Sequence, residues 1–296
     1  MAPRSTDAPA VAPLIVIVGP TASGKTALAI DLAQHYSGEI ICADSRTVYK
    51  GMDIGTAKPT AEERATVPHW GLDLVEPGEP FSAADFKRYA QQKIGEIRAR
   101  GHIPFVVGGT GLYVDSLIFD YQFGEKASDE VRASLQQMTI QQLQEYCSEH
   151  NIALPENDQN KRYLVRAIEQ SGINHNKRSE PINGVIVVGI ATDRDVLRQR
   201  IADRAEHLFD NGMVEEAKEL GKKYGWQNEA MTGNIYRLVH QYIDGQLSLD
   251  ELTQRNITAD WRLAKRQLTW LRRNRFIHWL PLPDARTFLV NKLSPN

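Results

Sequence analysis

A glycine-rich segment, Gly19–Thr26, directly follows the apolar run Leu14–Val18 and precedes a stretch whose apolar residues have helical spacing. The segment fits the P-loop pattern G-x-x-x-x-G-K-[ST], which is meaningful when a strand comes before it and a helix after it. Backbone N–H groups of such a loop surround an anion, and the positive end of the following helix points at the same place. The chain is therefore expected to build an α/β fold around a site for a di- or triphosphate.

Individual loop residues have distinct expected tasks. Lys25 places a point charge beside the outer phosphate oxygens, and the Thr26 hydroxyl faces Mg2+. Mg2+ is therefore the one cofactor that the sequence implies, with Thr26 as its predicted protein ligand. The residues expected to contact the phosphates are Gly19, Pro20, Thr21, Ala22, Ser23, Gly24, Lys25 and Thr26. The loop alone does not say which phosphate is bound or for what reaction.

Three more apolar runs predict buried parallel strands at Glu39–Cys42, Ile103–Val107 and Val185–Ile190. A helical pattern runs from Ala83 to Arg100, opened by Ser82 and closed by Gly101. The alternation of strands and helices predicts a P-loop doubly wound parallel sheet. Helical patterns also fill residues 193–275, and residues 276–280 are expected to form a short final strand.

Residues 120–184 differ from the rest, because they are polar and helical without a convincing strand. We interpret them as a helical insertion domain in a catalytic core made of residues 14–119 and 185–296. Residues 1–13 are rich in Pro and Ala and lack the apolar stretch of a secretory signal, so we expect a loose tail.

The bulk composition excludes several classes of protein. The net charge is −2, so any nucleic-acid surface must be local. No apolar run approaches the ~20 residues of a membrane span. Two cysteines give neither a disulfide framework nor zinc-ligand spacing, so the cytoplasm is the expected compartment. The sequence implies no protein partner, and we expect a monomer.

Polar or glycine-rich residues follow the second and third predicted strands, at the sheet edge where α/β proteins bind ligands. Asp44 there could bind Mg2+ or accept a proton from a nucleophile, or it could simply cap a turn with Ser45. The pair Gly108-Gly109 permits close approach of the backbone to a ligand, although a tight strand-to-helix turn explains it equally well.

Longer motifs resemble the bacterial tRNA dimethylallyltransferase family, and the resemblance runs from about Leu14 to Leu280. Its most specific part is Tyr49-Lys-Gly-Met-Asp-Ile-Gly-Thr-Ala-Lys-Pro59, which P-loop kinases do not share. The other motifs are Gly19–Thr26, Ala43–Ser45, Val67–His69, Ser82–Phe86, Val107–Tyr113 and Ala264–Arg272.

The resemblance implies an alkyl transfer. The P-loop would hold the diphosphate of dimethylallyl diphosphate, without ATP, and the acceptor would be N6 of the adenosine 3′ of a tRNA anticodon. Such a base must leave its stack to reach a pocket. Asp44 matches the catalytic aspartate, and Thr21 and Arg204 match residues beside the diphosphate. Arg204 could instead form a salt bridge with the neighbouring Asp203 or Glu206.

The resemblance also implies tRNA contacts. Asp44, Ser45, Arg46 and Thr47 match a segment that touches the target base, with Thr47 standing where Gln is more usual, and Thr110 matches an RNA-contacting position. In the insertion the matching residues are Arg132, Gln159, Asn160, Lys161, Arg162, Tyr163 and Arg166. Arg162 and Arg166 share a helix face and Tyr163 could stack on a base, but a solvated basic face is the alternative.

A helix near the C-terminus has a predicted buried face formed by Trp261, Ala264, Leu268 and Leu271. Its cationic residues are Arg262, Lys265, Arg266, Arg272 and Arg273, with Asp260 as the nearby acid. This stripe fits RNA phosphates, unless it balances acidic helices such as residues 215–219. The segment 231–237 departs from the family's Ile-Gly-Tyr-Lys-Glu motif, so no role is assigned there.

Two other functions compete with prenyl transfer to RNA. A P-loop phosphotransferase could act on a small metabolite with Asp44 as base, and a non-catalytic protein could bind both nucleotide and RNA. The basic helices favour RNA over a small metabolite, and a carboxylate beside the phosphate site favours an enzyme.

Overall fold

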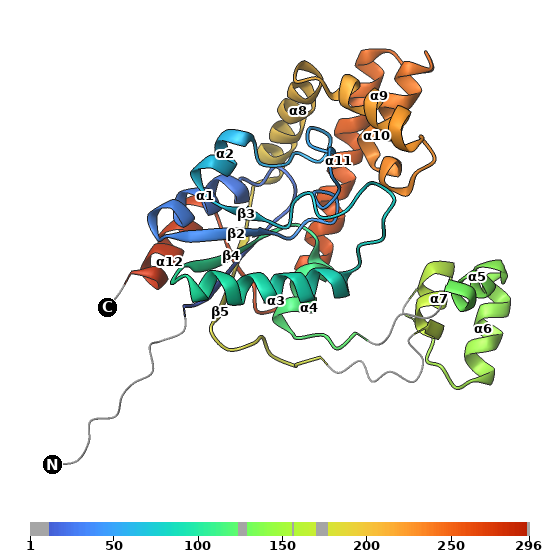
Figure 1. Cartoon of the computed structure of the whole chain (residues 1–296), viewed down its shortest axis with the longest axis horizontal. Helices are drawn as coiled ribbons and strands as arrows, with labels where there is room; N and C mark the ends of the chain where they lie inside the picture. Colours follow the sequence, from blue (N-terminus) through green and yellow to red (C-terminus); the bar gives the residue numbers. More distant parts are fainter. Residues whose placement is uncertain (1–11, 124–128, 156, 170–176, 295–296) are drawn as a thin grey trace. The chain divides into compact units, whose positions relative to one another are not determined.

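The computed structural model describes residues 12–123, 129–155, 157–169 and 177–294 (Figure 1). Most of the predicted N-terminal tail, residues 1–11, lies outside the described residues. The chain divides into two compact units: Met1–Phe119 with Glu180–Asn296, and Asp120–Ser179. Residues 180–184, which the sequence analysis placed in the insertion, are grouped with the larger unit.

The larger unit contains a parallel sheet, as the sequence predicted, and the sheet has six strands. The strand order is β3-β2-β4-β1-β5-β6. The strands are β1 (Leu14–Val18), β2 (Gly38–Cys42), β3 (His69–Trp70), β4 (Ile103–Gly108), β5 (Val185–Ile190) and β6 (His278–Leu280). All the predicted strands are present, and β3 is an additional one of two residues, too short to leave a periodic pattern.

The helices of the larger unit follow the doubly wound pattern. They are α1 (Lys25–His35), α2 (Ala61–Thr66), α3 (Ala83–Ala99), α4 (Gly111–Ile118), α8 (Arg194–Asp210), α9 (Met213–Tyr224), α10 (Asn234–Ile243), α11 (Leu249–Leu271) and α12 (Leu282–Leu293), with a 3-10 turn η1 (Glu229–Thr232). Ser82 opens α3 through a capping box with Asp85, which satisfies backbone donors at the helix start. No helix among the described residues is long and apolar enough to cross a membrane.

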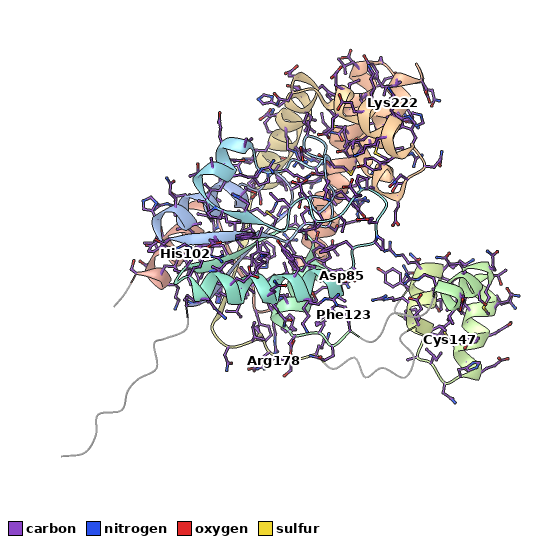
Figure 2. All side chains as sticks on the ribbon, in the orientation of Figure 1. Asp85, His102, Phe123, Cys147, Arg178 and Lys222 are labelled. Carbon is purple, nitrogen blue, oxygen red and sulfur yellow. The ribbon has the colours of Figure 1, made fainter. Side chains whose placement is uncertain are left out.

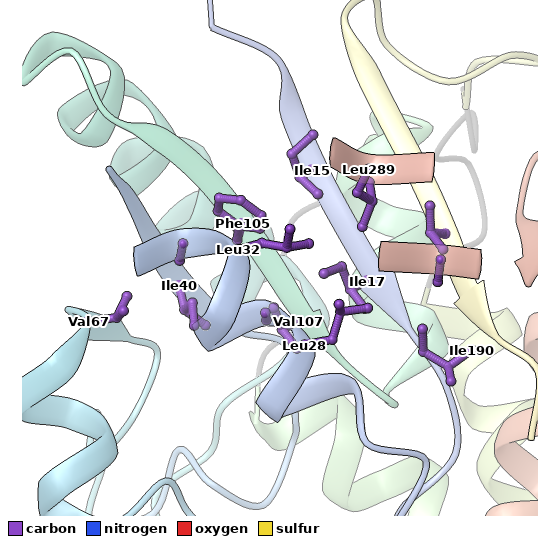
Figure 3. Packing of buried hydrophobic residues seen from close by; sticks show 14 of the residues in the cluster. Ile15, Ile17, Leu28, Leu32, Ile40, Val67, Phe105, Val107, Ile190 and Leu289 are labelled. Atoms are coloured by element: carbon purple, nitrogen blue, oxygen red, sulfur yellow. The ribbon is translucent and has the colours of Figure 1, made fainter. Parts of the chain in front are cut away.

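The apolar core lies on both faces of this sheet. On one face, Leu28 and Leu32 of α1 and Leu289 of α12 pack against Ile17 and Phe105 (Figure 3). Helices α3 and α4 cover the other face (Figure 1). Because both faces are covered, the residues of β1, β4 and β5 are apolar without alternation. This layering leaves the carboxyl edge of the strands free to carry the site.

The smaller unit is helical in the residues described, with α5 (Asp129–Gln137), α6 (Ile140–Glu149) and α7 (Lys161–Glu169). Its own apolar cluster includes Leu143 and Cys147 of α6 and Leu164 and Ile168 of α7. A capping box at Thr139 fixes the start of α6.

Candidate functional site

The P-loop connects β1 to α1 in a conformation shaped for an anion. Gly24 has a φ of +88° and Ala22 a φ of +62°, so the chain turns through the left-handed region twice. A Cβ on Gly19 would lie 2.7 Å from Ser23 Oγ, which explains the glycine there. Ser23 Oγ is buried and has no hydrogen-bond partner among the described residues. An unsatisfied donor inside this loop fits an incoming phosphate oxygen.

Lys25 is poised to respond to a bound anion. Its ammonium donates to Pro20 O at 3.2 Å. Burial lowers the pKa of Lys25. The Asp44 carboxylate raises this pKa in part and the Arg204 charge lowers it again, so the pKa is about 8. A diphosphate would supply the negative charge that this ammonium lacks, because opposite charge favours the charged form.

Arg204 of α8 contacts the P-loop, and its ionic partner is neither Asp203 nor Glu206. Its Nη1 donates to Thr21 Oγ1 at 2.5 Å, and its Nη2 donates to Asp260 Oδ2 of α11, also at 2.5 Å. Gln267 of α11 accepts a hydrogen bond from Thr21 N at 2.8 Å. Helix α11 therefore holds both the loop and the arginine in place.

The segment after β2 brings Asp44 to the same edge of the sheet. Asp44 Oδ1 accepts a hydrogen bond from Arg46 N at 2.8 Å, so the carboxylate does form a turn. Ser45 N donates to Thr110 Oγ1 at 3.0 Å, which ties the ends of β2 and β4 together. Thr47 is buried, and its hydroxyl donates to Asp44 O at 3.3 Å.

The glycines after β4 are explained by contacts within the protein. A Cβ on Gly108 would lie 2.0 Å from Ala43 O, and one on Gly109 would lie 2.3 Å from the Gln267 amide nitrogen. These glycines therefore permit the close approach of β2 and α11. A tight strand-to-helix turn explains both glycines without a contact to a ligand.

One cavity of about 330 Å³ joins these elements. Its polar lining includes Thr21, Lys25, Asp44, Thr110 and Arg204. Its apolar lining comes from side chains of five segments, namely Met52, Leu208, Ala230, Ile235 and Leu263. The cavity can therefore hold a charged group next to a small hydrocarbon group.

Three polar residues that α11 contributes to this cavity were not predicted from the sequence as site residues. Asn256, Asp260 and Gln267 line it, and both side-chain polar atoms of Asn256 are buried without a partner among the described residues. Their spacing of four and seven residues places them on one helix face, which is the pattern that could have revealed them.

The basic side of α11 forms a second hollow, of about 580 Å³. Its lining residues are Arg262, Lys265, Arg266, Thr269, Trp270 and Arg273, and Arg266 also lines the first cavity. Trp261 and Leu268 were predicted to be buried but are only half-buried, and Arg198 lies 4.8 Å from the centroid of the Trp261 ring. The cationic surface of α11 thus continues onto α8.

The structure separates the predicted RNA-contacting residues of the insertion into two groups. Arg162, Tyr163 and Arg166 are exposed on α7. Arg132 instead makes a bidentate ion pair with the buried side chain of Glu169, at 2.6 and 2.9 Å, and Arg166 Nη1 lies 3.8 Å from the same carboxylate.

The segment that begins α7 makes local contacts. Asn160 Oδ1 caps α7 by accepting from Arg162 N, Lys161 Nζ donates to Gln136 O, and the Gln159 amide lies 3.3 Å from Asp158 Oδ1. These contacts shape the start of the helix, and their roles toward RNA stay predictions.

Comparison with known proteins decides the family. The sequence profile of IPP transferases matches residues 47–274, and that of isopentenyl transferases matches residues 12–70. The tRNA dimethylallyltransferase of Geobacillus thermodenitrificans is 39% identical, over 94% of this chain and 93% of that protein. The chain belongs to the IPP transferase family. The resemblance stated from the motifs is therefore confirmed, and a P-loop kinase is not favoured.

Solved structures of IPP transferases share the fold. The crystal structure of the tRNA isopentenylpyrophosphate transferase from Bacillus halodurans has a TM-score of 0.72 and 35% identity, covering 95% of this chain and 96% of that one. A eukaryotic dimethylallyltransferase acting on tRNA has a TM-score of 0.78 at 24% identity, covering 91% of this chain and 73% of that one, which shows the fold alone. The predicted α/β fold class is confirmed.

Proposed function

We propose that this chain transfers a dimethylallyl group from dimethylallyl diphosphate to N6 of the adenosine 3′ of the anticodon in tRNA, releasing diphosphate. The observation that carries the proposal is that the Asp44 carboxylate and the cations Lys25 and Arg204 line one cavity that also has an apolar wall. A leaving group, a small hydrocarbon and a proton acceptor can therefore be accommodated together.

The residues have separate tasks in the reaction. The P-loop amides, Lys25 and Arg204 stabilise the charge that develops on the diphosphate as the allylic C–O bond breaks and the diphosphate leaves with the electron pair. The N6 lone pair forms the new C–N bond to the allylic carbon. Asp44 accepts the proton that N6 loses, which is general-base catalysis.

Mg2+ is the cofactor that we propose, bound mainly through substrate oxygens. Among the residues described, no group of three or more His, Cys, Asp or Glu side chains could hold a metal ion. Mg2+ is commonly held by few protein ligands together with phosphate oxygens and waters. Thr26 would contribute its hydroxyl, and the bound ion would neutralise charge on the leaving diphosphate.

The anticodon stem-loop of tRNA is the partner we propose for the basic surfaces. The groove on α11 carries four cationic side chains around Trp270, and Arg266 lies where this groove meets the catalytic cavity. Arg and aromatic side chains suit single-stranded RNA, whose bases can be splayed out. The cytoplasm is the compartment we propose, consistent with two free cysteines.

The test offers the purified protein dimethylallyl diphosphate labelled in the prenyl group together with tRNA, and in parallel labelled ATP with tRNA. Label transferred to tRNA only from the prenyl donor supports the proposal, and nuclease digestion locates the labelled nucleoside. Turnover of ATP without prenyl transfer would overturn it in favour of a phosphotransferase. Asp44→Asn is the matched negative control.

A further inference from the structure

Glu216 of α9 makes a concentrated set of hydrogen bonds close to the catalytic cavity. Its Oε2 accepts from Asp53 N at 2.9 Å and from Ile54 N at 2.7 Å. Its Oε1 accepts from Gly55 N at 3.0 Å and from the hydroxyl of Tyr236 at 2.7 Å. One side chain thus satisfies three consecutive backbone donors and a tyrosine.

Three successive N–H groups that converge on one point form a concavity suited to an anion. Here the anion is an internal carboxylate, contributed by a helix more than 160 positions away in the sequence. Hydrogen bonds to a charged acceptor are shorter and stronger than those between neutral groups. Glu216 therefore fixes the backbone of residues 53–55.

The same loop is held from its other side by Lys58. The Lys58 ammonium is fully buried and donates to Asp53 Oδ1 at 2.7 Å, to Asp73 Oδ1 at 2.6 Å and to Tyr49 O at 2.7 Å. Asp53 is thus bound twice. Its side chain accepts a hydrogen bond from Lys58, and its backbone N–H donates one to Glu216.

Tyr236 completes the arrangement. A Cβ on Gly55 would lie 2.6 Å from the Tyr236 ring, so the ring packs directly on the loop backbone. Burial, together with the negative charge of Glu216, raises the pKa of Tyr236, which keeps its hydroxyl protonated and donating to Glu216. Helix α10 is therefore fastened to the loop by the same carboxylate.

The held loop is part of the cavity wall. Gly55, Thr56 and Ala57 line the cavity, whereas Glu216 does not. The part of the cavity wall that includes Thr21 and Lys25 belongs to the P-loop, which is a different segment of the chain. We propose that Glu216 is a positioning residue for prenyl transfer, which sets the cavity wall at residues 55–57 against the reacting groups without touching them. This inference rests on the proposed function.

The chemistry predicts a selective effect. Displacing a cavity wall by about 1 Å is enough to lower a reaction rate by roughly 100-fold, because reacting atoms must be aligned. The diphosphate, in contrast, is held by the P-loop and Arg204, which Glu216 does not contact. Loss of Glu216 should therefore lower kcat and leave the affinity for inorganic pyrophosphate intact.

The experiment compares Glu216→Ala, Glu216→Gln and Tyr236→Phe with the control Glu215→Ala, an exposed neighbour on the same helix. We measure kcat and KM for tRNA, the Kd of inorganic pyrophosphate by calorimetry, and amide hydrogen exchange in residues 53–55. We expect kcat to fall about 100-fold in Glu216→Ala and about 10-fold in Glu216→Gln, which keeps one acceptor oxygen. Exchange at residues 53–55 should accelerate while the pyrophosphate Kd stays within about two-fold.

Unchanged kcat in folded Glu216→Ala would overturn the inference, as would a pyrophosphate Kd that weakens in parallel with kcat. If Glu216→Ala does not fold, the milder Glu216→Gln decides by the same criteria, because Tyr236 itself lines the cavity. Absence of label transfer by the wild-type protein would instead refute the proposed function. The two failures are therefore distinguishable.

Discussion

Arg204 and Asp260 form an ion pair in the cavity wall, with a guanidinium nitrogen 2.5 Å from a carboxylate oxygen. Asp260 is almost fully buried, and the second terminal nitrogen of Arg204 is bound to Thr21. The guanidinium is therefore fixed in direction before any substrate arrives. A preorganised cation costs little reorganisation when charge develops on a leaving group.

Arg204→Ala should lower kcat/KM for dimethylallyl diphosphate by about 100-fold, because one preorganised contact to the developing charge is lost. Steady-state kinetics with tRNA in excess measure this. Arg198→Ala is the matched control, since Arg198 lies on the same helix but contacts Trp261 and does not line the cavity. Equal losses in both variants would contradict a specific contact by Arg204.

The pKa of about 8 for Lys25 predicts a pH-dependent affinity for inorganic pyrophosphate. The ammonium is charged below that pKa and neutral above it, so the affinity should fall as the pH rises through about 8. Binding near that pH should also take up a proton, which calorimetry in buffers of different ionisation enthalpy detects.

Lys25→Arg separates this effect from titration of the pyrophosphate itself. Arginine stays charged over the whole range, so the variant should keep only the ligand's own pH dependence. Identical pH profiles for the two proteins between about pH 7 and pH 9 would show that Lys25 does not titrate there.

Asp44→Asn should lower turnover by roughly 10²–10⁴-fold while leaving tRNA affinity nearly intact, because a general base is lost without a change of shape. The asparagine oxygen can still accept from Arg46 N, as Asp44 does at 2.8 Å, so the loop geometry should persist. Single-turnover rates and tRNA filter binding give the two quantities. Turnover equal to wild type would remove Asp44 as the base.

The exposed face of α7 gives a prediction about salt. Replacing both Arg162 and Arg166 by Ala should weaken tRNA binding and reduce the slope of log Kd against log salt concentration by up to about 2, since each lost phosphate contact removes roughly 0.7–0.9. The control removes two cations from α12, by Arg286→Ala with Lys292→Ala. An unchanged slope in the α7 variant would assign that face to solvent.

The features that were predictable from the sequence are those that local pattern determines. The strands of the sheet are continuous apolar runs, and the P-loop and the Ser82 cap are local motifs, so each was found close to its observed bounds. Strand β3 and helix α12 were not predicted, because the first has two residues and the second was hidden behind Pro281 and Pro283.

The remaining parts of the site depend on distant contacts. Neighbouring acids looked like partners for Arg204, but residues one or two apart on a helix point in different directions, and the observed partner Asp260 lies on another helix. The Glu216 contacts likewise join residues whose proximity only the folded chain creates. Motif resemblance found Asp44 and Lys25 because their neighbours in sequence are also their neighbours in the site.

A cluster around the buried Glu39, at the opposite, amino-terminal edge of the sheet, predicts how the protein responds to acid. Glu39 accepts hydrogen bonds from Arg100 at 2.8 and 2.9 Å and from Trp70 at 2.7 Å, and its Oε1 lies 2.7 Å from His102 Nδ1. Figure 2 shows His102 at the far end of α3 from Asp85. Burial raises the pKa of Glu39, but the hydrogen bonds from Arg100, Trp70 and His102 outweigh it and lower the pKa to about 2.

Because the folded-state pKa of Glu39 lies below its usual value of 4.5, its contribution to stability is complete above that value and is lost as the pH falls toward about 2. Glu39→Gln should therefore destabilise the fold by about 3 kcal/mol near neutral pH and by progressively less in acid. Urea unfolding across this pH range measures the difference, with the exposed Glu219→Gln on α9 as control. A difference that does not shrink in acid would show that packing, and not the carboxylate charge, makes Glu39 stabilising.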